Sequence, residues 1–470
     1  MNHMSKHLQE NLSYLKQSLA LESNFDLVYR TIFIGGKEAC FVFVDGFCKD
    51  ELMEKILQFF LDITPQDRPC DPYYFLKEKM PYVEVEKSGL FATIENGILS
   101  GVFALFLDDY PEAILIDSRT YPARDVSEPE KDKTLRGSKD GFVETLIFNT
   151  ALIRRRIRSP WLRMEIFQVG TVSHTDVVLC YMQDRVDRKY LDEIKRRIRS
   201  IKRESLTMNQ ESLAECLYEG HWFNPFPKFQ YTERPDKSTA QILEGNIAIL
   251  VDNSPFCMLL PNSVFDLVEE ADDYYFPPVT GTYLRICRFL IAIFAYFLTP
   301  LYLLATMYQN ALPEALRFML PMEDINVPIF LQYLIMELAI DGLRLASVNT
   351  PSMLSTPLSI LAGLVLGEFS VSSGFFNQEV MLSMSFVAVA NYTQPSYELG
   401  YAIKFMRLIT LTATFLFGIW GFLGGVIFTF VALVTNKTVA GKSYLYPLIP
   451  FHAGKFCKHL IRTSHRSKSS

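Results

Sequence analysis

Long apolar runs in the second part of the chain limit its possible folds more than any other feature. The runs cover 286–307, 325–346, 358–376, 380–392 and 408–434. A helix rises about 1.5 Å per residue, so a run of about 20 residues spans the roughly 30 Å hydrocarbon core of a bilayer. Charged residues concentrate before residue 280. The sequence therefore predicts a soluble N-terminal half joined to a helical membrane half.

Strand and helix patterns alternate in the N-terminal half. β-Branched and aromatic residues flank Gly35 and Gly36, which predicts a hairpin, and a helix is expected at 50–62. Asn96 and Gly97 form the dipeptide that a two-residue type I′ turn prefers, so a second hairpin is predicted around them. The expected fold is an α+β cytosolic N-terminal region of two αβ subdomains, followed by an all-α polytopic membrane domain.

Composition shifts along the chain predict its segments. We expect a first cytosolic αβ subdomain at 1–122 and a second at 123–280, with a connecting segment at 117–158. A transmembrane domain with about four crossings is expected at 281–440, followed by a basic cytoplasmic tail at 441–470. The N-terminal residues do not resemble a signal peptide, so the N-terminal region is expected on the cytoplasmic side. The basic tail is expected on the same side by the positive-inside bias.

The last apolar run, 408–434, is ambiguous in its topology. It is long enough for one tilted crossing, or for two short crossings if it breaks at 424–425. In a count of four crossings, 358–392 behaves as one broken crossing, and Lys404 and Arg407 then lie on the far side, against the positive-inside bias. A re-entrant segment at 358–392 therefore stays open.

Charged residues interrupt the second and third runs. Glu337, Asp341 and Arg344 stand four and three residues apart, so they share one face of a helix. A charge at the centre of a membrane costs at least about 2.5–3.5 kcal/mol, so this face is expected to look into protein or water. One interpretation is an internal ion pair of Arg344 with Glu337 or Asp341, and the other is the polar wall of an ion path. Glu368 is a further intramembrane carboxylate.

Two glycine pairs have the spacing that permits close approach of membrane helices. They are Gly363 with Gly367, and Gly421 with Gly425. The motif predicts helix packing and identifies no partner.

The connecting segment at 117–158 is dense in charge. Arg119, Arg124, Arg136 and Glu144 are candidate contacts between subunits. The alternative is a solvated loop linked by ion pairs, which contribute little at a surface.

A basic run at 154–158 ends a helix that Gly141 is expected to open. Positive charge is favourable at a helix C-terminus. Clustered Arg near a membrane also attracts acidic lipid. Both interpretations stay open.

No motif in the sequence indicates an enzyme. The eight cysteines include no Cys-x-x-Cys pair, and no His residues cluster beside them, so no metal site is expected. No nucleotide-binding loop or nucleophile arrangement occurs, so we expect no cofactor and no catalytic residues. A net charge of -6 argues against nucleic acid as a partner.

Several long motifs resemble the GerA family, the A subunits of bacterial spore germinant receptors. In the soluble half they are SRTYPAR, EPEKDKTLRGSKDGFVETLIFNTALIRRRIR and RPDKSTAQILEGNIAILVDNSP. In the membrane half, LIMELAIDGLRLAS, TPLSILAGLVLGEFSVSSGFFNQEV and QPSYELGYAIKFMRL look closest to the SpoVAF branch. Receptor subunits usually have Glu-Leu-Leu-Arg-Glu-Ala where this chain has 341–346, so the charge after the arginine is missing here.

The resemblance implies a multi-pass protein of the spore inner membrane. It also implies a homo-oligomeric ring of such subunits around an ion pathway that opens when germination begins. The partner would be another small or polytopic germination membrane protein, besides the lipid bilayer itself.

We therefore predict an ion-channel subunit of a germination complex. In a ring, the face with Glu337, Asp341 and Arg344 would line a shared lumen together with Glu368. The alternative is a non-conducting scaffold or signal-relay subunit whose intramembrane charges bind a partner. A nutrient transporter is a third possibility.

Overall fold

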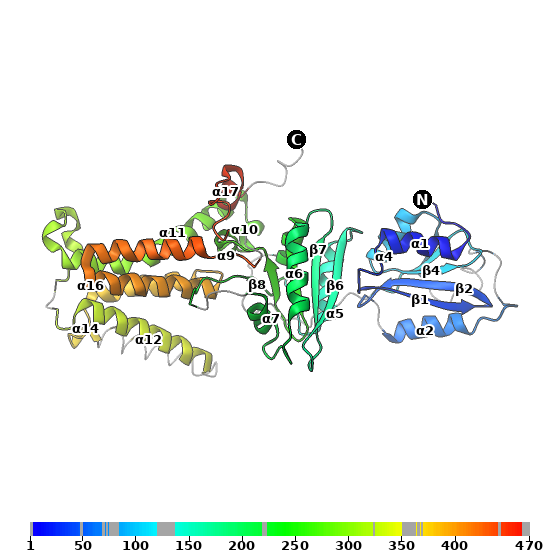
Figure 1. Ribbon diagram of the computed structural model, residues 1–470, viewed down its shortest axis with the longest axis horizontal. Helices are drawn as coiled ribbons and strands as arrows, with labels where there is room; N and C mark the ends of the chain where they lie inside the picture. Colours follow the sequence, from blue (N-terminus) through cyan, green and yellow to red (C-terminus); the bar gives the residue numbers. More distant parts are fainter. Residues whose placement is uncertain are drawn as a thin grey trace. The chain divides into compact units, whose positions relative to one another are not determined.

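The computed structural model describes residues 3–47, 50–67, 71, 74, 84–119, 137–218, 223–322, 325–349, 363, 367, 370–439 and 443–462. The chain forms two compact units (Figure 1). The N-terminal unit comprises Met1–Glu219 and Phe229–Pro261, and the helical unit comprises Gly220–Lys228 and Asn262–Ser470. An α+β region followed by a helical region is the predicted fold class, which is confirmed. The predicted segment boundaries stay predictions.

The first subdomain of the N-terminal unit is an antiparallel sheet between helices. Its strands, in spatial order, are β1 (Leu27–Ile34), β2 (Lys37–Val44), β4 (Phe103–Leu107), β5 (Ala113–Ile116) and β3 (Val85–Ser88). Its helices are α1 (Leu8–Ser18), α2 (Asp50–Leu61) and α4 (Phe91–Leu99). α1 and α4 cover one face of the sheet and α2 covers the other (Figure 1).

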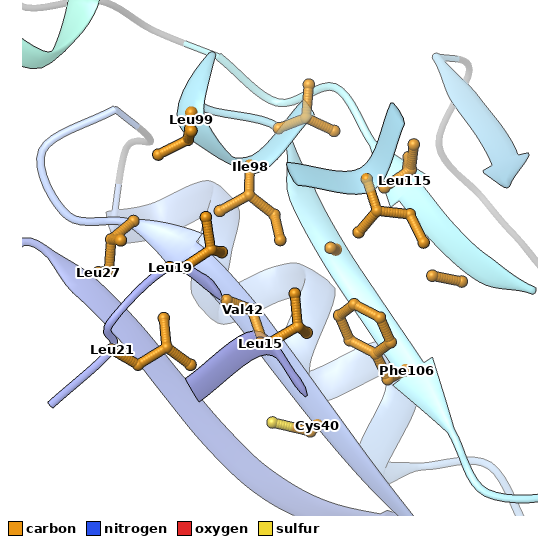
Figure 2. Packing of buried hydrophobic residues seen from close by; sticks show 14 of the residues in the cluster. Leu15, Leu19, Leu21, Leu27, Cys40, Val42, Ile98, Leu99, Phe106 and Leu115 are labelled. Atoms are coloured by element: carbon orange, nitrogen blue, oxygen red, sulfur yellow. The ribbon is translucent and has the colours of Figure 1, made fainter. Parts of the chain in front are cut away.

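The core under α1 and α4 is closely packed. Figure 2 shows Leu15 of α1, Val42 of β2, Ile98 of α4 and Phe106 of β4 converging, and each is 0% exposed. Burial of one such side chain contributes about 1.5–3 kcal/mol relative to exposure. This shared core fixes both helices on the sheet.

One of the two predicted hairpins is wrong. Gly35 and Gly36 form the predicted turn between β1 and β2, both with positive φ. Asn96 and Gly97, in contrast, lie inside α4. The helix buries a stripe of residues spaced by three and four, Phe91, Ile94 and Ile98. Burial of that stripe overrides the local turn preference.

The second subdomain has the same architecture. Its strands, in spatial order, are β6 (Leu162–Val169), β7 (Thr175–Met182), β9 (Ile247–Val251), β10 (Cys257–Leu260) and β8 (Gln230–Thr232), all antiparallel. Its helices are α5 (Leu146–Arg156), α6 (Arg188–Ser200), α7 (Asn209–Leu217) and α8 (Pro235–Leu243). α5 and α8 contribute to one core with the sheet.

The two subdomains are structural repeats of one another. In each, the first, second, fourth, fifth and third strands along the chain lie side by side in that order. Each sheet is preceded by a helix of 11 residues, α1 or α5. The N–H of Leu8 at the start of α1 donates to Asp108 (3.0 Å), and that of Leu146 at the start of α5 donates to Asp252 (3.3 Å).

Further contacts confirm this correspondence residue by residue. Asn11 in α1 exchanges two hydrogen bonds with the backbone of Ser5, and Asn149 at the same place in α5 does so with Val143. Both asparagines are 0% exposed. Each buried side-chain amide is thus satisfied by the backbone six residues earlier, and these hydrogen bonds fix the segment that leads into the helix.

A short arm from the first subdomain joins it to the second. The N–H of Phe25 donates to the carbonyl of Met164 (3.1 Å), and the side chain of Asn24 accepts from the N–H of Met164 (2.8 Å). Arg154 of α5 donates to both carboxylate oxygens of Asp26, at 2.8 and 3.1 Å. Arg154 lies in the last turn of α5, where the helix dipole was expected to favour a cation. Its side chain is completely buried, so attraction to lipid headgroups is wrong for this residue.

The helical unit carries the predicted membrane segments. Its helices are α9 (Val264–Val268), α10 (Asp272–Tyr275), α11 (Pro278–Met307), η2 (Gln309–Ala311), η3 (Glu314–Met319), α12 (Ile329–Asn349), α14 (Ser370–Ser372), α15 (Gln378–Tyr392), α16 (Tyr397–Thr435) and α17 (Ala453–Leu460). Among the described residues, α11 and α16 are long and apolar enough to cross a membrane, with mean hydropathy of 2.0 and 2.2. Much of the predicted run at 358–376 lies outside the described residues.

Helix α16 folds back on itself at Gly418, where φ is +57°. The hydroxyl of Tyr296 lies 2.7 Å from the Thr410 hydroxyl and 2.8 Å from the Thr429 hydroxyl. In a straight helix these two threonines would be about 28 Å apart. The two legs therefore lie side by side (Figure 1). Of the two alternatives for this run, the structure has two short helices, and the break lies at Gly418 instead of at 424–425.

Candidate functional site

A cluster of four charged side chains joins α12 to α16 inside the helical unit. Glu337 of α12 forms ion pairs with Arg407 and with Lys404 of α16, the latter at 3.0 Å. The side chains of these residues are 7%, 0% and 6% exposed, respectively. Arg407 also donates to the carbonyl of Ala295 in α11 (3.1 Å). Residues of three helices therefore meet around the buried pair of Glu337 with Arg407.

The fourth member of the cluster lies at its open end. Asp341, one helical turn beyond Glu337, pairs with Lys404, and its side chain is 33% exposed. Two carboxylates and two cations make the cluster neutral overall. Because Lys404 and Arg407 are three residues apart, they face the same way on α16 and meet both carboxylates of α12.

Arg344 does not take part in the ion pairs that were predicted for it. Its guanidinium lies over the rings of Tyr392, Tyr397 and Tyr401, at 5.1, 5.3 and 5.1 Å from their centroids. Cation–π contacts of this kind stabilise a partly desolvated cation. The predicted pairing of Arg344 with Glu337 or Asp341 is therefore replaced by pairing of the carboxylates with α16.

A small polar hollow lies between Asp341, Arg344, Asn391, Tyr401 and Lys404. Its volume is about 10 Å³, which is close to the space that one water molecule needs. The charged cluster thus has a dry end at Glu337 and an end that small polar groups can reach at Asp341.

The predicted packing glycines differ in their surroundings. A Cβ on Gly421 would lie 1.8 Å from the Ala413 carbonyl oxygen, and one on Gly425 would lie 2.8 Å from Thr410. These two glycines let the legs of α16 approach. A Cβ on Gly363 or Gly367 would meet no atom of the described chain within 4 Å.

Other predicted site residues lie elsewhere or outside the described chain. Arg119 is exposed and pairs with Asp117, and Glu144 is exposed before α5. Arg124, Arg136 and Glu368 lie outside the described residues. Their predicted roles in subunit contact or at an ion path stay predictions.

Lys404 and Arg407 are the site residues that the sequence analysis did not assign to the site. In the sequence, these two cations indicated only a conflict with the positive-inside bias. Lys404 and Arg407 are three residues apart, and Glu337 and Asp341 are four apart, so each pair lies on one face of its helix. A search for two helical faces of opposite charge could have identified Lys404 and Arg407 as the partners.

A second ionic cluster holds the C-terminal helix α17 against the start of α11. Arg285 and Arg288 both pair with the buried Asp273. Arg285 also contacts Glu269, which lies 2.8 Å from the Nδ1 atom of His459. Burial lowers the pKa of His459, but its hydrogen bond to Glu269 and nearby negative charge outweigh burial and hold the pKa above its usual value.

The described part of the chain contains no group of three or more His, Cys, Asp and Glu side chains able to hold a metal. The ion pairs of Glu337 and Asp341 with Lys404 and Arg407 make the candidate site a set of paired charges within the helical unit.

Comparison with known proteins relates the whole chain to spore germination. The sequence profile of the "Bacillus/Clostridium GerA spore germination protein" family matches residues 13–470. Stage V sporulation protein AF of Bacillus subtilis (strain 168) is 33% identical over 97% of this chain and 92% of its own length. Spore germination protein GerLA of Bacillus cereus is 29% identical over 94% of this chain and 90% of its own length.

A solved structure also matches the N-terminal part. It is the N-terminal domain of the A subunit of the Bacillus megaterium spore germinant receptor GerK3, with 24% identity and a TM-score of 0.42. The match covers 55% of this chain and 96% of the solved one. Together, the profile match over nearly the whole sequence and the full-length relatives show that this chain belongs to the GerA family of spore germination proteins.

Proposed function

We propose that this protein is a subunit of an oligomeric germination complex in the spore inner membrane, and that several copies form a ring that conducts ions when germination begins. The observation that carries the proposal is the open end of the charge cluster. Asp341 is one-third exposed there, on a helix whose exposed residues include Leu338 and Leu345. In a single subunit within lipid, this arrangement would expose a charge to hydrocarbon, which is costly.

Assembly of several copies removes that cost. If the open ends of the clusters face a common axis, each Asp341 meets water instead of lipid, and a ring of carboxylates favours cations. The buried Glu337 then serves as the anchor that holds α12 on α16. The relatives support a role in germination, because Stage V sporulation protein AF and GerLA are named for sporulation and germination.

The test is ion flux through the full chain reconstituted in lipid vesicles. Asp341→Asn should lower the preference for cations over anions, measured as a shift in reversal potential, because it removes the exposed carboxylate from the path. Glu314→Gln is the matched control, since Glu314 is an exposed acid in η3, outside the cluster. Unchanged selectivity in Asp341→Asn, with ion flux retained, would contradict the assignment of Asp341 to the path.

A second function is favoured by a different observation. Within one chain, Glu337 is already satisfied by Lys404 and Arg407, as expected of a cluster that only packs helices. A non-conducting scaffold or signal-relay subunit would then use Asp341 and Arg344 to bind another germination membrane protein. In that case vesicles with the wild-type chain carry no current, and Arg344→Gln reduces recovery of the partner from spore membranes.

A further inference from the structure

Because the two subdomains are repeats, the first subdomain has a surface equivalent to the one that the arm covers on the second subdomain. In the second subdomain, Arg154 of α5 and Met164 of β6 are covered by the arm from the first subdomain. The ninth residue of α1 corresponds to Arg154 and is Lys16, and the third residue of β1 corresponds to Met164 and is Tyr29. The arm comes from the first subdomain itself, so it cannot cover this second surface.

The surface of the second subdomain, which the arm covers, is buried, and the equivalent surface of the first subdomain is partly exposed. Arg154 and Met164 are both 0% exposed, whereas Tyr29 is 37% exposed. Phe33, further along the same strand, is 71% exposed. β1 is also an edge strand, so its outer backbone groups are open to pairing. We call the surface of Lys16, Tyr29 and Phe33 the α1–β1 face.

The group that would cover this face is identified by the same correspondence. Asp26, which pairs with Arg154, directly precedes β1, and Trp161 directly precedes β6. The carbonyl of Asp26 accepts from the N–H of Asp45 (2.8 Å), and that of Trp161 accepts from Gln183 at the equivalent place after β7 (2.9 Å). Trp161 is therefore the structural equivalent of Asp26, and it is 54% exposed.

We propose that a second copy of this chain places Trp161 on the α1–β1 face, so that the contact joining the two subdomains within a chain is repeated between chains. The contact is head-to-tail, since one copy offers Trp161 and the other offers Lys16 and Tyr29. Such heterologous contacts close into rings when the rotation between copies divides a full turn evenly. The inference rests on the assembly of several copies in the proposed function, and it does not depend on ion conduction.

The side chains at the proposed contact are chemically suited to each other. Within one chain, Asp26 and Arg154 form an ion pair. At the equivalent place between two chains, Trp161 would form a cation–π contact with Lys16, and tryptophan is the best aromatic partner for a cation. Lys16 already lies over the Tyr29 ring, with its Nζ atom 5.0 Å from the ring centroid. A tryptophan from the second copy would complete an aromatic pair around that ammonium. Exposed aromatic residues of this kind are enriched at the centres of protein interfaces.

The first experiment is self-association of the full chain in detergent, followed by mass measurement over a range of concentrations. Trp161→Ala should weaken association about tenfold or more, as expected for an aromatic interface anchor. Lys16→Glu should weaken it comparably, whereas Lys16→Arg should retain it because Arg also stacks on aromatic rings. Val172→Ala is the matched control, because Val172 is 73% exposed in the turn that follows β6, and it should change association less than twofold.

The second experiment is crosslinking in membranes, in a background whose eight native cysteines are replaced. Trp161→Cys with Lys16→Cys should give a ladder of covalent multimers with a short bis-maleimide, and Val172→Cys with Lys16→Cys should not. A wild-type chain that is monomeric at every concentration overturns both this inference and the proposed ring. Oligomers whose mass is unaffected by Trp161→Ala and Lys16→Glu, with no crosslinked ladder, overturn this inference alone and leave the proposed function standing.

Discussion

Replacement of Glu337 by glutamine should be among the most destabilising single changes in the helical unit. The substitution keeps the shape of the side chain but removes the charge that faces two cations. Arg407 is 0% exposed, and among the described residues its hydrogen bond outside the cluster is the one to the Ala295 carbonyl at 3.1 Å. Breaking a buried ion pair by removing one partner costs about 3–5 kcal/mol, because it leaves a buried charge uncompensated.

Asp341→Asn provides the internal comparison. Asp341 is one-third exposed, and Lys404 keeps Glu337 at 3.0 Å when Asp341 loses its charge. Solvent screening reduces the worth of such an exposed pair to about 1 kcal/mol or less. The two conservative substitutions should therefore differ several-fold in cost, although they lie one helical turn apart.

The assay is reversible unfolding of the full chain in mixed micelles, followed by far-ultraviolet circular dichroism. A double variant, Glu337→Gln with Arg407→Gln, should recover much of the lost stability because it removes the orphaned charge. Polar contacts between membrane helices average only about 0.6 kcal/mol in measured cycles. A cost for Glu337→Gln near that value, or equal to the cost of Asp341→Asn, would refute the reasoning that this cluster is a buried electrostatic anchor.

Two further predictions concern packing and pH. Gly421→Ala should destabilise the hairpin of α16 by about 1–3 kcal/mol or more, because the new Cβ would overlap a carbonyl of the facing leg. Gly424→Ala is the control and should be close to neutral, since a Cβ there would meet no atom within 4 Å. Thermal unfolding measures the stability of both variants. Since the pKa of His459 is raised, the contribution of its contact with Glu269 is fully present below pH 6.5 and is lost as pH rises through the raised pKa. The protection of α17 amides, taken relative to the base-catalysed intrinsic exchange rate, should therefore fall at alkaline pH in the wild type but not in His459→Gln. The exposed His452 serves as the control substitution.

Local sequence patterns predicted the N-terminal elements where burial and propensity agree. The hairpin predicted around Gly35 and Gly36 is formed by β1 and β2, because its β-branched and aromatic residues suit strands and its glycines adopt the positive φ of the turn. The membership in the GerA family, first indicated by a resemblance, is confirmed by the profile match. The helix at Phe91–Leu99 was missed, since a turn dipeptide says nothing about the core that packs over it.

The charge cluster could be predicted only in part. Glu337 and Asp341 stood out because carboxylates are costly in an apolar segment. Their partners come from α16, more than 60 residues further along the chain, and no local pattern links the two helices. The internal repeat was hidden for a related reason: the subdomains share strand order and backbone contacts, but aligned positions such as Lys16 and Arg154 or Asp26 and Trp161 differ in chemistry.

The reversal of α16 at Gly418 has a consequence for how the protein enters its membrane. No charged residue lies between Arg407 and Lys437, so the segment that turns is apolar throughout. The two legs can insert together as a pair during synthesis, with only the tight turn at Gly418 to be carried across. If the pair inserts in this way, both of its ends stay on the side where insertion began, and Lys404 and Arg407 need not be carried across the hydrocarbon core.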